Sequence, residues 1–139
     1  MSEASLAVQK AIRSRLIGTP ALVALVPADH ILDRNQRPAP DPSIVLGEDQ
    51  VVNPGVTIAR DVVRVYSTLH VWKREPSLAG VKSIAGEIAK AIWFGPGLDL
   101  ETGYQWCDSV VESFRALRDP DGETSHGILT INSLVRVLQ

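Results

Sequence analysis

The stretch that decides the fold is DVVRVYSTLHVWKREPSLAGVKSIAGEIAKAIW, residues 61–93. Its first half alternates with the period of two of a strand, and one face carries Val63, Val65, Ser67, Leu69 and Val71. This alternation predicts a strand over residues 60–73. After Pro76 the apolar positions change to a helical period, which predicts a helix over residues 77–93 with the buried stripe Leu78, Val81, Ala85, Ile88 and Ile92. We expect this stripe to pack on the apolar strand face.

Two helices are expected ahead of this unit. Residues 2–17 carry apolar side chains at helical spacing, and either Ser2 or Ser5 is positioned to cap them. A Thr-Pro pair then begins a second, short helix at residues 21–26, because proline is favoured at the first helical position.

Extended segments follow these helices. Residues 30–33 and 43–49 are predicted strands, joined by a rigid connector over residues 34–42 that contains three prolines. Residues 50–59 include the turn sequence Asn-Pro-Gly and predict a long, exposed and mobile loop.

The last forty residues predict a long β-hairpin. Two extended runs, residues 104–118 and 125–138, flank a Pro-Asp-Gly turn. We assign Gly122 to a positive φ and Asp119 and Asp121 to hydrogen bonds within the turn. The element order α-α-β-β-β-α-β-β predicts an α+β fold, in which helices cover one face of an antiparallel sheet. All of it forms a single domain, residues 1–139.

Composition excludes several classes of function. The 139 residues carry 14 Lys and Arg against 16 Asp and Glu, so the formal net charge of -2 offers no general attraction for phosphates. The longest apolar stretch, residues 21–26, is far short of the roughly 20 residues that cross a bilayer, and no secretory signal is visible. The single cysteine, Cys107, excludes an internal disulfide and a cysteine-based zinc site, and we interpret it as a buried or half-buried structural residue. A soluble domain of a reducing compartment is expected.

Charge is unevenly spread along the chain. Residues 59–98 hold six basic and three acidic side chains, whereas residues 99–139 hold three basic and seven acidic ones. Two interpretations stay open: the two regions pair between copies of the chain, or both are ordinary solvated surface.

The sequence predicts no catalytic, cofactor-binding or metal site. No histidine has a partner at metal-ligand spacing on a predicted helix. We expect His70 to fill the second face of the sheet and His126 to stabilise the turn. An enzyme would require candidates among Glu48, Asp49, His70 or His126 to converge in one pocket, and side chains dispersed over the structure would eliminate it. A nucleic-acid-binding module would instead need an exposed stacking face built from Tyr66, Thr68, His70 and Trp72.

Four short motifs resemble those of one protein family. They are VLGED at residues 45–49, LHVWKR at 69–74, RDPDG at 118–122 and HG at 126–127. In this order and spacing they resemble the tail-completion, or tail-terminator, proteins of long-tailed phages and of phage-like gene transfer agents. The resemblance covers almost the whole chain. It departs from the family at residues 53–55, where Asn-Pro-Gly stands in place of a bulky residue.

The resemblance implies a structural virion protein without enzymatic activity or cofactor. Relatives form a hexameric ring that caps the tail tube, ends its polymerisation and joins the tail to the head-neck complex. The implied partners are other copies of the chain, the tail tube protein and a head-completion protein, with DNA passing through the ring without specific binding. The implied location is the tail–neck junction of a particle assembled in the bacterial cytoplasm, with no membrane contact. The alternatives are a stopper-type head–tail connector of the neck and the small single-stranded nucleic-acid-binding module.

A ring needs contacts between two different surfaces of neighbouring copies. The charge asymmetry, together with the resemblance, predicts the residues of that interface: Arg60, Arg64, Trp72, Arg74, Asp119, Asp121 and Glu123.

Overall fold

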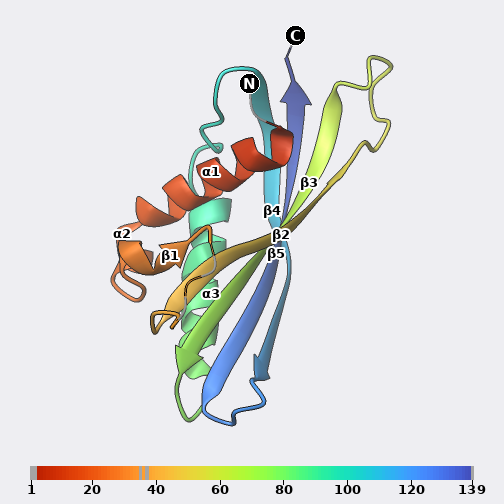
Figure 1. Cartoon of the computed structure of the whole chain (residues 1–139). Helices are drawn as coiled ribbons and strands as arrows, with labels where there is room; N and C mark the ends of the chain where they lie inside the picture. Colours follow the sequence, from red (N-terminus) through yellow and green to blue (C-terminus); the bar gives the residue numbers. More distant parts are fainter. Residues whose placement is uncertain (1–2, 35, 37, 139) are drawn as a thin grey trace.

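A computed structural model describes residues 3–34, 36 and 38–138 of the chain. Five strands form one sheet in the spatial order β1 (Ile31–Leu32), β2 (Ser43–Val52), β3 (Val62–Arg74), β5 (Thr124–Val137) and β4 (Tyr104–Arg118). The helices α1 (Ala4–Ile17) and α3 (Ala79–Trp93) lie on one side of this sheet, and the short α2 (Pro20–Val23) follows α1 (Figure 1). The predicted α+β class, with helices on one face and a C-terminal hairpin, is confirmed.

The sheet is mixed rather than wholly antiparallel. Strand β1 pairs parallel with β2 through Ile31 and Ile44, whereas the other three strand pairs are antiparallel. Parallel neighbours need a connection that carries the chain back along the sheet, and the residues between β1 and β2 provide it. A hairpin turn at this position would have given the antiparallel arrangement that the sequence suggested.

The unit formed by β3 and α3 is the centre of the core, as predicted. Val65, Leu69 and Val71 on β3 have no exposed surface, and neither have Val81 and Ile88 on α3. Full burial of one such side chain contributes about 1.5–3 kcal/mol, so this contact is a large part of the stability of the fold.

Helix α3 begins at Ala79, two residues later than predicted, because its first turn is capped from outside. The Glu75 carboxylate accepts hydrogen bonds from the backbone N–H of Gly80 (2.7 Å) and Val81 (3.1 Å), and Ser77 Oγ accepts one from Ala79 (3.2 Å). A carboxylate at this end of a helix satisfies free N–H groups and favours the helix dipole.

Helix α1 is capped by a residue that the sequence analysis did not select. The Glu3 carboxylate accepts the backbone N–H of Ser5 at 3.0 Å, so Ser5 is not the cap, and Ser2 lies outside the described residues. Arg15 on α1 reaches the end of α3, where its guanidinium donates to the carbonyls of Ala91 (2.8 Å) and Gly97 (3.0 Å). This side chain therefore ties α1 to α3.

The β4–β5 hairpin has nearly the predicted bounds. Gly122 has a φ of 74°, as assigned from the turn sequence. The Asp121 carboxylate accepts hydrogen bonds from the backbone N–H of Glu123 (2.8 Å) and Thr124 (2.9 Å) and from the Thr124 hydroxyl (2.7 Å). Asp119 contributes through its backbone, whose N–H donates to the Thr124 carbonyl (2.8 Å) and whose carbonyl accepts from the Gly122 N–H (2.9 Å).

The prediction that Cys107 is buried or half-buried is wrong, because this residue is exposed. The pairing of β4 with β5 is irregular between Trp106 and Asp108, so Cys107 is an extra residue without a partner on β5. Within the described part of the chain, no helix combines the length and apolarity needed to cross a bilayer.

Candidate functional site: a cleft on the open sheet face

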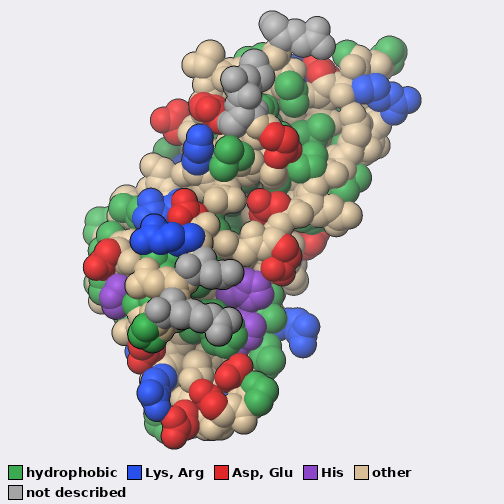
Figure 2. Space-filling view, viewed as in Figure 1, with side chains coloured by type: hydrophobic (Ala, Val, Ile, Leu, Met, Phe, Trp, Pro, Cys, Tyr) green, Lys and Arg blue, Asp and Glu red, His purple; other side chains and the backbone are tan. Residues whose placement is uncertain are grey.

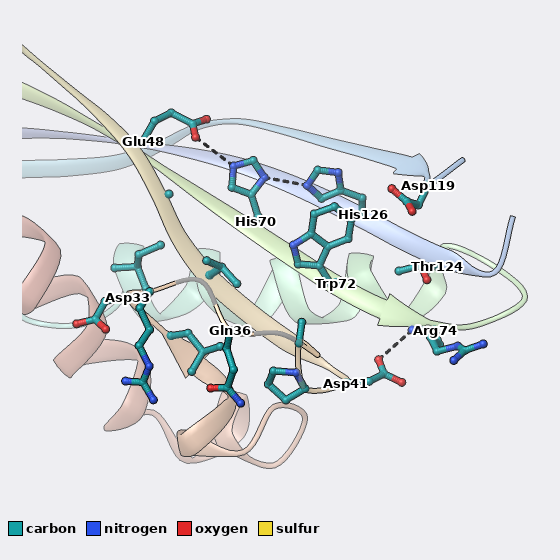
Figure 3. Close-up of a pocket in the computed structure, with 17 residues that line it drawn as sticks. Asp33, Gln36, Asp41, Glu48, His70, Trp72, Arg74, Asp119, Thr124 and His126 are labelled. Carbon is teal, nitrogen blue, oxygen red and sulfur yellow. Dashed lines mark hydrogen bonds and ion pairs between the residues drawn. The ribbon is translucent and has the colours of Figure 1, made fainter. Parts of the chain in front are cut away.

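A cleft of about 910 Å³ lies where the connector between β1 and β2 passes the ends of β2, β3 and β5. We call it the open-face cleft, because its β3 and β5 side chains lie on the sheet face that the helices leave uncovered. Its principal lining residues are Asp33, Arg34, Asp41, Val45, Glu48, His70, Trp72, Arg74, Asp119, Thr124 and His126. In Figure 3, Glu48, His70, Trp72 and His126 lie on the strand side of this cleft, and Asp33, Gln36 and Asp41 lie on its connector side.

The cleft is built around a cluster of three rings. Trp72 on β3 is directly opposite His126 on β5 in the sheet register, and their rings stack with centroids 3.7 Å apart. His70 lies two residues earlier on the same face of β3, and its Nδ1 is 2.8 Å from Nε2 of His126. The cross-strand register thus explains why these side chains meet. Figure 3 shows the three rings side by side.

The ring cluster continues to a carboxylate on β2. His70 Nε2 is 3.4 Å from the Oε2 atom of Glu48, whose side chain is otherwise mostly exposed. Hydrogen bonding to its own backbone N–H, followed by the contact with His70, lowers the pKa of Glu48. Three of the four candidate residues for an enzyme therefore do converge. Asp49, the fourth, is exposed outside the lining of the cleft.

Burial lowers the pKa of His126, and the charges of His70 and Arg115 act in the same direction, while Asp119 opposes them. The hydrogen bond between the two imidazoles requires one nitrogen to donate and the other to accept. Protonation of both rings would place two donors face to face. The contact therefore needs one of the two imidazoles to be neutral, and the lowered pKa of His126 favours the neutral form of that ring.

The predicted role of His126 in the turn is wrong, since its ring contacts His70 and Trp72 instead. His70, in contrast, fills the second face of the sheet as expected. Both could have been placed on this face from strand alternation, but their contact depends on the pairing of β3 with β5. Nothing local in the sequence indicates that register.

The chemistry of the cleft lining is limited to a few kinds of group. The Thr124 hydroxyl is the only hydroxyl among its described lining residues, and it is donated to Asp121 at 2.7 Å. Among all described residues, no three His, Cys, Asp or Glu side chains are arranged to hold a metal ion. What the cleft offers is an apolar ledge, formed by Trp72 and Val45, beside exposed carboxylates.

Several predicted interface residues already have partners within the chain. Arg74 forms an ion pair with Glu123, and Arg64 donates to Asn132 Oδ1 at 3.0 Å. Asp121 is engaged in the turn, and Trp72 in the ring cluster. Arg74, Trp72 and Asp119 line the open-face cleft. Arg60 lies at the other end of β3, so the structure does not bring the predicted residues into one patch.

Arg60 belongs to a second exposed feature, the tip loop, residues 53–61 between β2 and β3. Figure 1 shows it projecting from the end of the sheet, away from the helices. Asn53 bridges the loop: its side chain donates to the Arg60 carbonyl (2.9 Å) and accepts from the Gly55 N–H (2.9 Å). The side chains of Val56 and Ile58 are 60% and 101% exposed. In Figure 2 this end of the molecule carries both apolar and basic side chains.

Comparison with known proteins shows the family. The family model described as "Tail completion protein gp17" matches residues 10–136, nearly the whole chain. The chain belongs to this tail completion family. Membership gives it a structural role in tail completion and locates it in the tail of a virion. The match extends from α1 to β5, so this tail completion protein has both the open-face cleft and the tip loop within its family domain.

Two solved structures share the fold. A chain from "Virion of native gene transfer agent (GTA) particle" has a TM-score of 0.80 at 20% identity, covering 97% of this chain and 99% of that one. A chain from "Structure of bacteriophage SPP1 gp17 protein" has a TM-score of 0.61 at 24% identity, covering 94% and 89%. Among curated proteins, none matches the chain.

Proposed function

We propose that this tail completion protein assembles into a closed ring, with six copies, at the end of the tail tube. The ring ends tube polymerisation and presents a surface to a head-completion protein at the tail–neck junction. The observation that carries the proposal is the family match over residues 10–136. The likeness to a chain of a gene transfer agent particle, over nearly the full length of both chains, supports the same assignment.

The charge of the protein is compatible with a ring that surrounds DNA. With a net charge of -2, its surface gives passing phosphates no general attraction, and DNA moves through without being held. The partners in this proposal are other copies of the chain, the tail tube protein and the head-completion protein.

Nucleic-acid binding on the open face is less well supported. The face of Tyr66, Thr68, His70 and Trp72 does lie away from the helices, as that function would need, but all four side chains are half-buried. The described residues of the adjoining cleft include more acidic than basic groups: Asp33, Asp41, Glu48 and Asp119 against Arg34 and Arg74. Phosphates would be repelled from this ledge. We likewise assign no catalytic step to the histidine cluster.

The test is to remove the gene from the particle-producing cell and to image the particles by cryo-electron microscopy. We expect overlong tails and unattached heads without the protein, and a ring at the tail–neck junction when it is present. Tails of normal length without the protein would refute tube termination. Density on the head side of the neck would favour the stopper-type connector instead.

A further inference from the structure

We propose that the tip loop of one copy inserts into the open-face cleft of the next copy, so that this contact closes the ring. The inference rests on the proposed function, and it specifies which two surfaces meet. Both surfaces are features of the described chain.

The tip loop has the exposed apolar surface of a docking element. Val56 and Ile58 in the loop, together with Val51 and Val52 at the adjoining end of β2, all expose more than a third of their surface within eight consecutive residues. Single exposed apolar side chains are common, but a cluster at the end of a projecting hairpin marks an interaction site. The hydrogen bonds of Asn53 across the loop hold its shape, which reduces the entropy lost on docking.

The open-face cleft has the complementary chemistry. Its floor contains Trp72 and Val45, and its connector wall contains Ala39 and Pro40, which give apolar side chains a surface to contact. At about 910 Å³ it is in the size range of sites that enclose most of a ligand, and therefore accommodates the tip of a loop.

Charge selects the orientation of the contact. The tip loop carries two charged residues: Asp61 is 3.5 Å from Arg136 within the same chain, whereas the side chain of Arg60 is exposed. Glu48 and Asp33 are exposed acids of the cleft, and the Glu48 side chain stays mostly exposed beside His70. An Arg side chain entering beside Trp72 gains both a carboxylate partner and an aromatic face.

The positions of the two surfaces suit a ring. The tip loop precedes Val62, the first residue of β3, whereas His70 and Trp72 lie near its far end. Ten residues of strand separate Val62 from Trp72, a distance of roughly 33 Å at about 3.3 Å per residue. Each copy therefore presents its tip loop at one end of the sheet and its open-face cleft near the other end. Such a head-to-tail contact repeats from copy to copy and closes when the rotation allows.

Cysteine cross-linking tests the contact directly. In a Cys107→Ser background, Ile58→Cys is combined with Asp33→Cys, and particles are treated with a short bismaleimide. We expect a ladder of covalent oligomers from the double variant and only monomers from either single variant. The matched control pairs Ile58→Cys with Lys82→Cys, an exposed residue on the helix side, and gives no ladder. Dimers from Ile58→Cys alone would indicate a tip-to-tip contact and overturn the proposal.

Charge exchange provides a second measurement. Arg60→Glu and Glu48→Arg each place like charges in the contact, and we expect each to lower the yield of complete particles at least threefold. The combined variant restores the yield. Ile58 is exposed in the single chain and would be buried by the proposed docking. Ile58→Ser removes this apolar side chain from each contact and weakens association by about tenfold or more. Additive losses in the combined variant would overturn the pairing of Arg60 with Glu48.

The outcomes separate this inference from the function on which it rests. A ring at the tail end in which the Ile58→Cys/Asp33→Cys pair forms no ladder would overturn the tip-to-cleft contact and leave the ring intact. A ladder without any ring at the tail–neck junction would support the contact and refute the proposed function.

Discussion

Replacing Ile88 with Ala tests the packing of α3 on the sheet. Ile88 has no exposed surface and belongs to the single core formed by α1, α3 and the sheet. Each lost methyl or methylene group is worth about 0.8 kcal/mol, which totals about 2.4 kcal/mol for this change. The cavity left behind raises the expected loss to about 3–4 kcal/mol, because packed neighbours relax only partly.

The chain offers a matched control, since Ile58→Ala is the same chemical change at a fully exposed position. Unfolding in urea, followed by tryptophan fluorescence at low protein concentration, gives both free energies of unfolding. We expect Ile58→Ala to lie within about 0.5 kcal/mol of the parent protein. The thermal midpoint of Ile88→Ala should fall by about 10 °C. Equal stability of the two variants would refute the packing of α3 described above.

Three further changes have defined outcomes. Gly122→Val forces a β-branched residue into a positive φ and should cost about 1–2 kcal/mol in urea unfolding, whereas an unchanged midpoint would show that the turn adopts another conformation. Arg15→Met leaves the carbonyls of Ala91 and Gly97 without their charged donor and should cost about 2–3 kcal/mol, while Lys10→Met, at an exposed position of the same helix, should be nearly neutral. The pKa of His126 is lowered on folding, so the unfolded chain binds more protons than the folded one near its ordinary value of 6.5, and stability is lost as the pH falls through and below that value. His126→Gln should flatten the pH dependence of the thermal midpoint on the acidic side of neutrality; a full pH dependence in His126→Gln would show that other groups cause it.

The elements that sequence analysis located best are those with long, uninterrupted periodicity. The alternation of residues 62–74 and the helical stripe through Ile88 specify both the element and its buried face. The conformation of the turn around Gly122 could be predicted equally well, because it depends on a few adjacent residues.

Features that depend on residues distant in the sequence could not be predicted in this way. The start of α3 depends on Glu75, which lies outside the helix and folds back onto its first turn. Likewise, the exposure of Cys107 results from a bulge on an edge strand, where alternation no longer specifies burial.

The candidate site was predictable only in part. Alternation placed His70 and Trp72 on one face, yet their contact with His126 depends on strands that are about 50 residues apart in the sequence. The connector that closes the cleft has no periodicity from which its path could be predicted. The tip loop, in contrast, was identified by its Asn-Pro-Gly turn and its position between two strands.

The internal position of β5, between β3 and β4, determines when this protein can fold. Its residues pair with β3 on one side and β4 on the other. Val62, the first residue of β3, pairs with Arg136 near the end of the chain, so the sheet cannot be completed until β5 has been synthesised. During synthesis, the apolar face of β3 and the stripe of α3 leave the ribosome before β5 does. Such long-range pairing is slow to form, because the loop between the strands must close first. Nascent chains that stop short of β5 would expose these surfaces and are expected to aggregate or to be degraded. In a cell, the supply of assembly-competent copies is therefore set by completed chains alone.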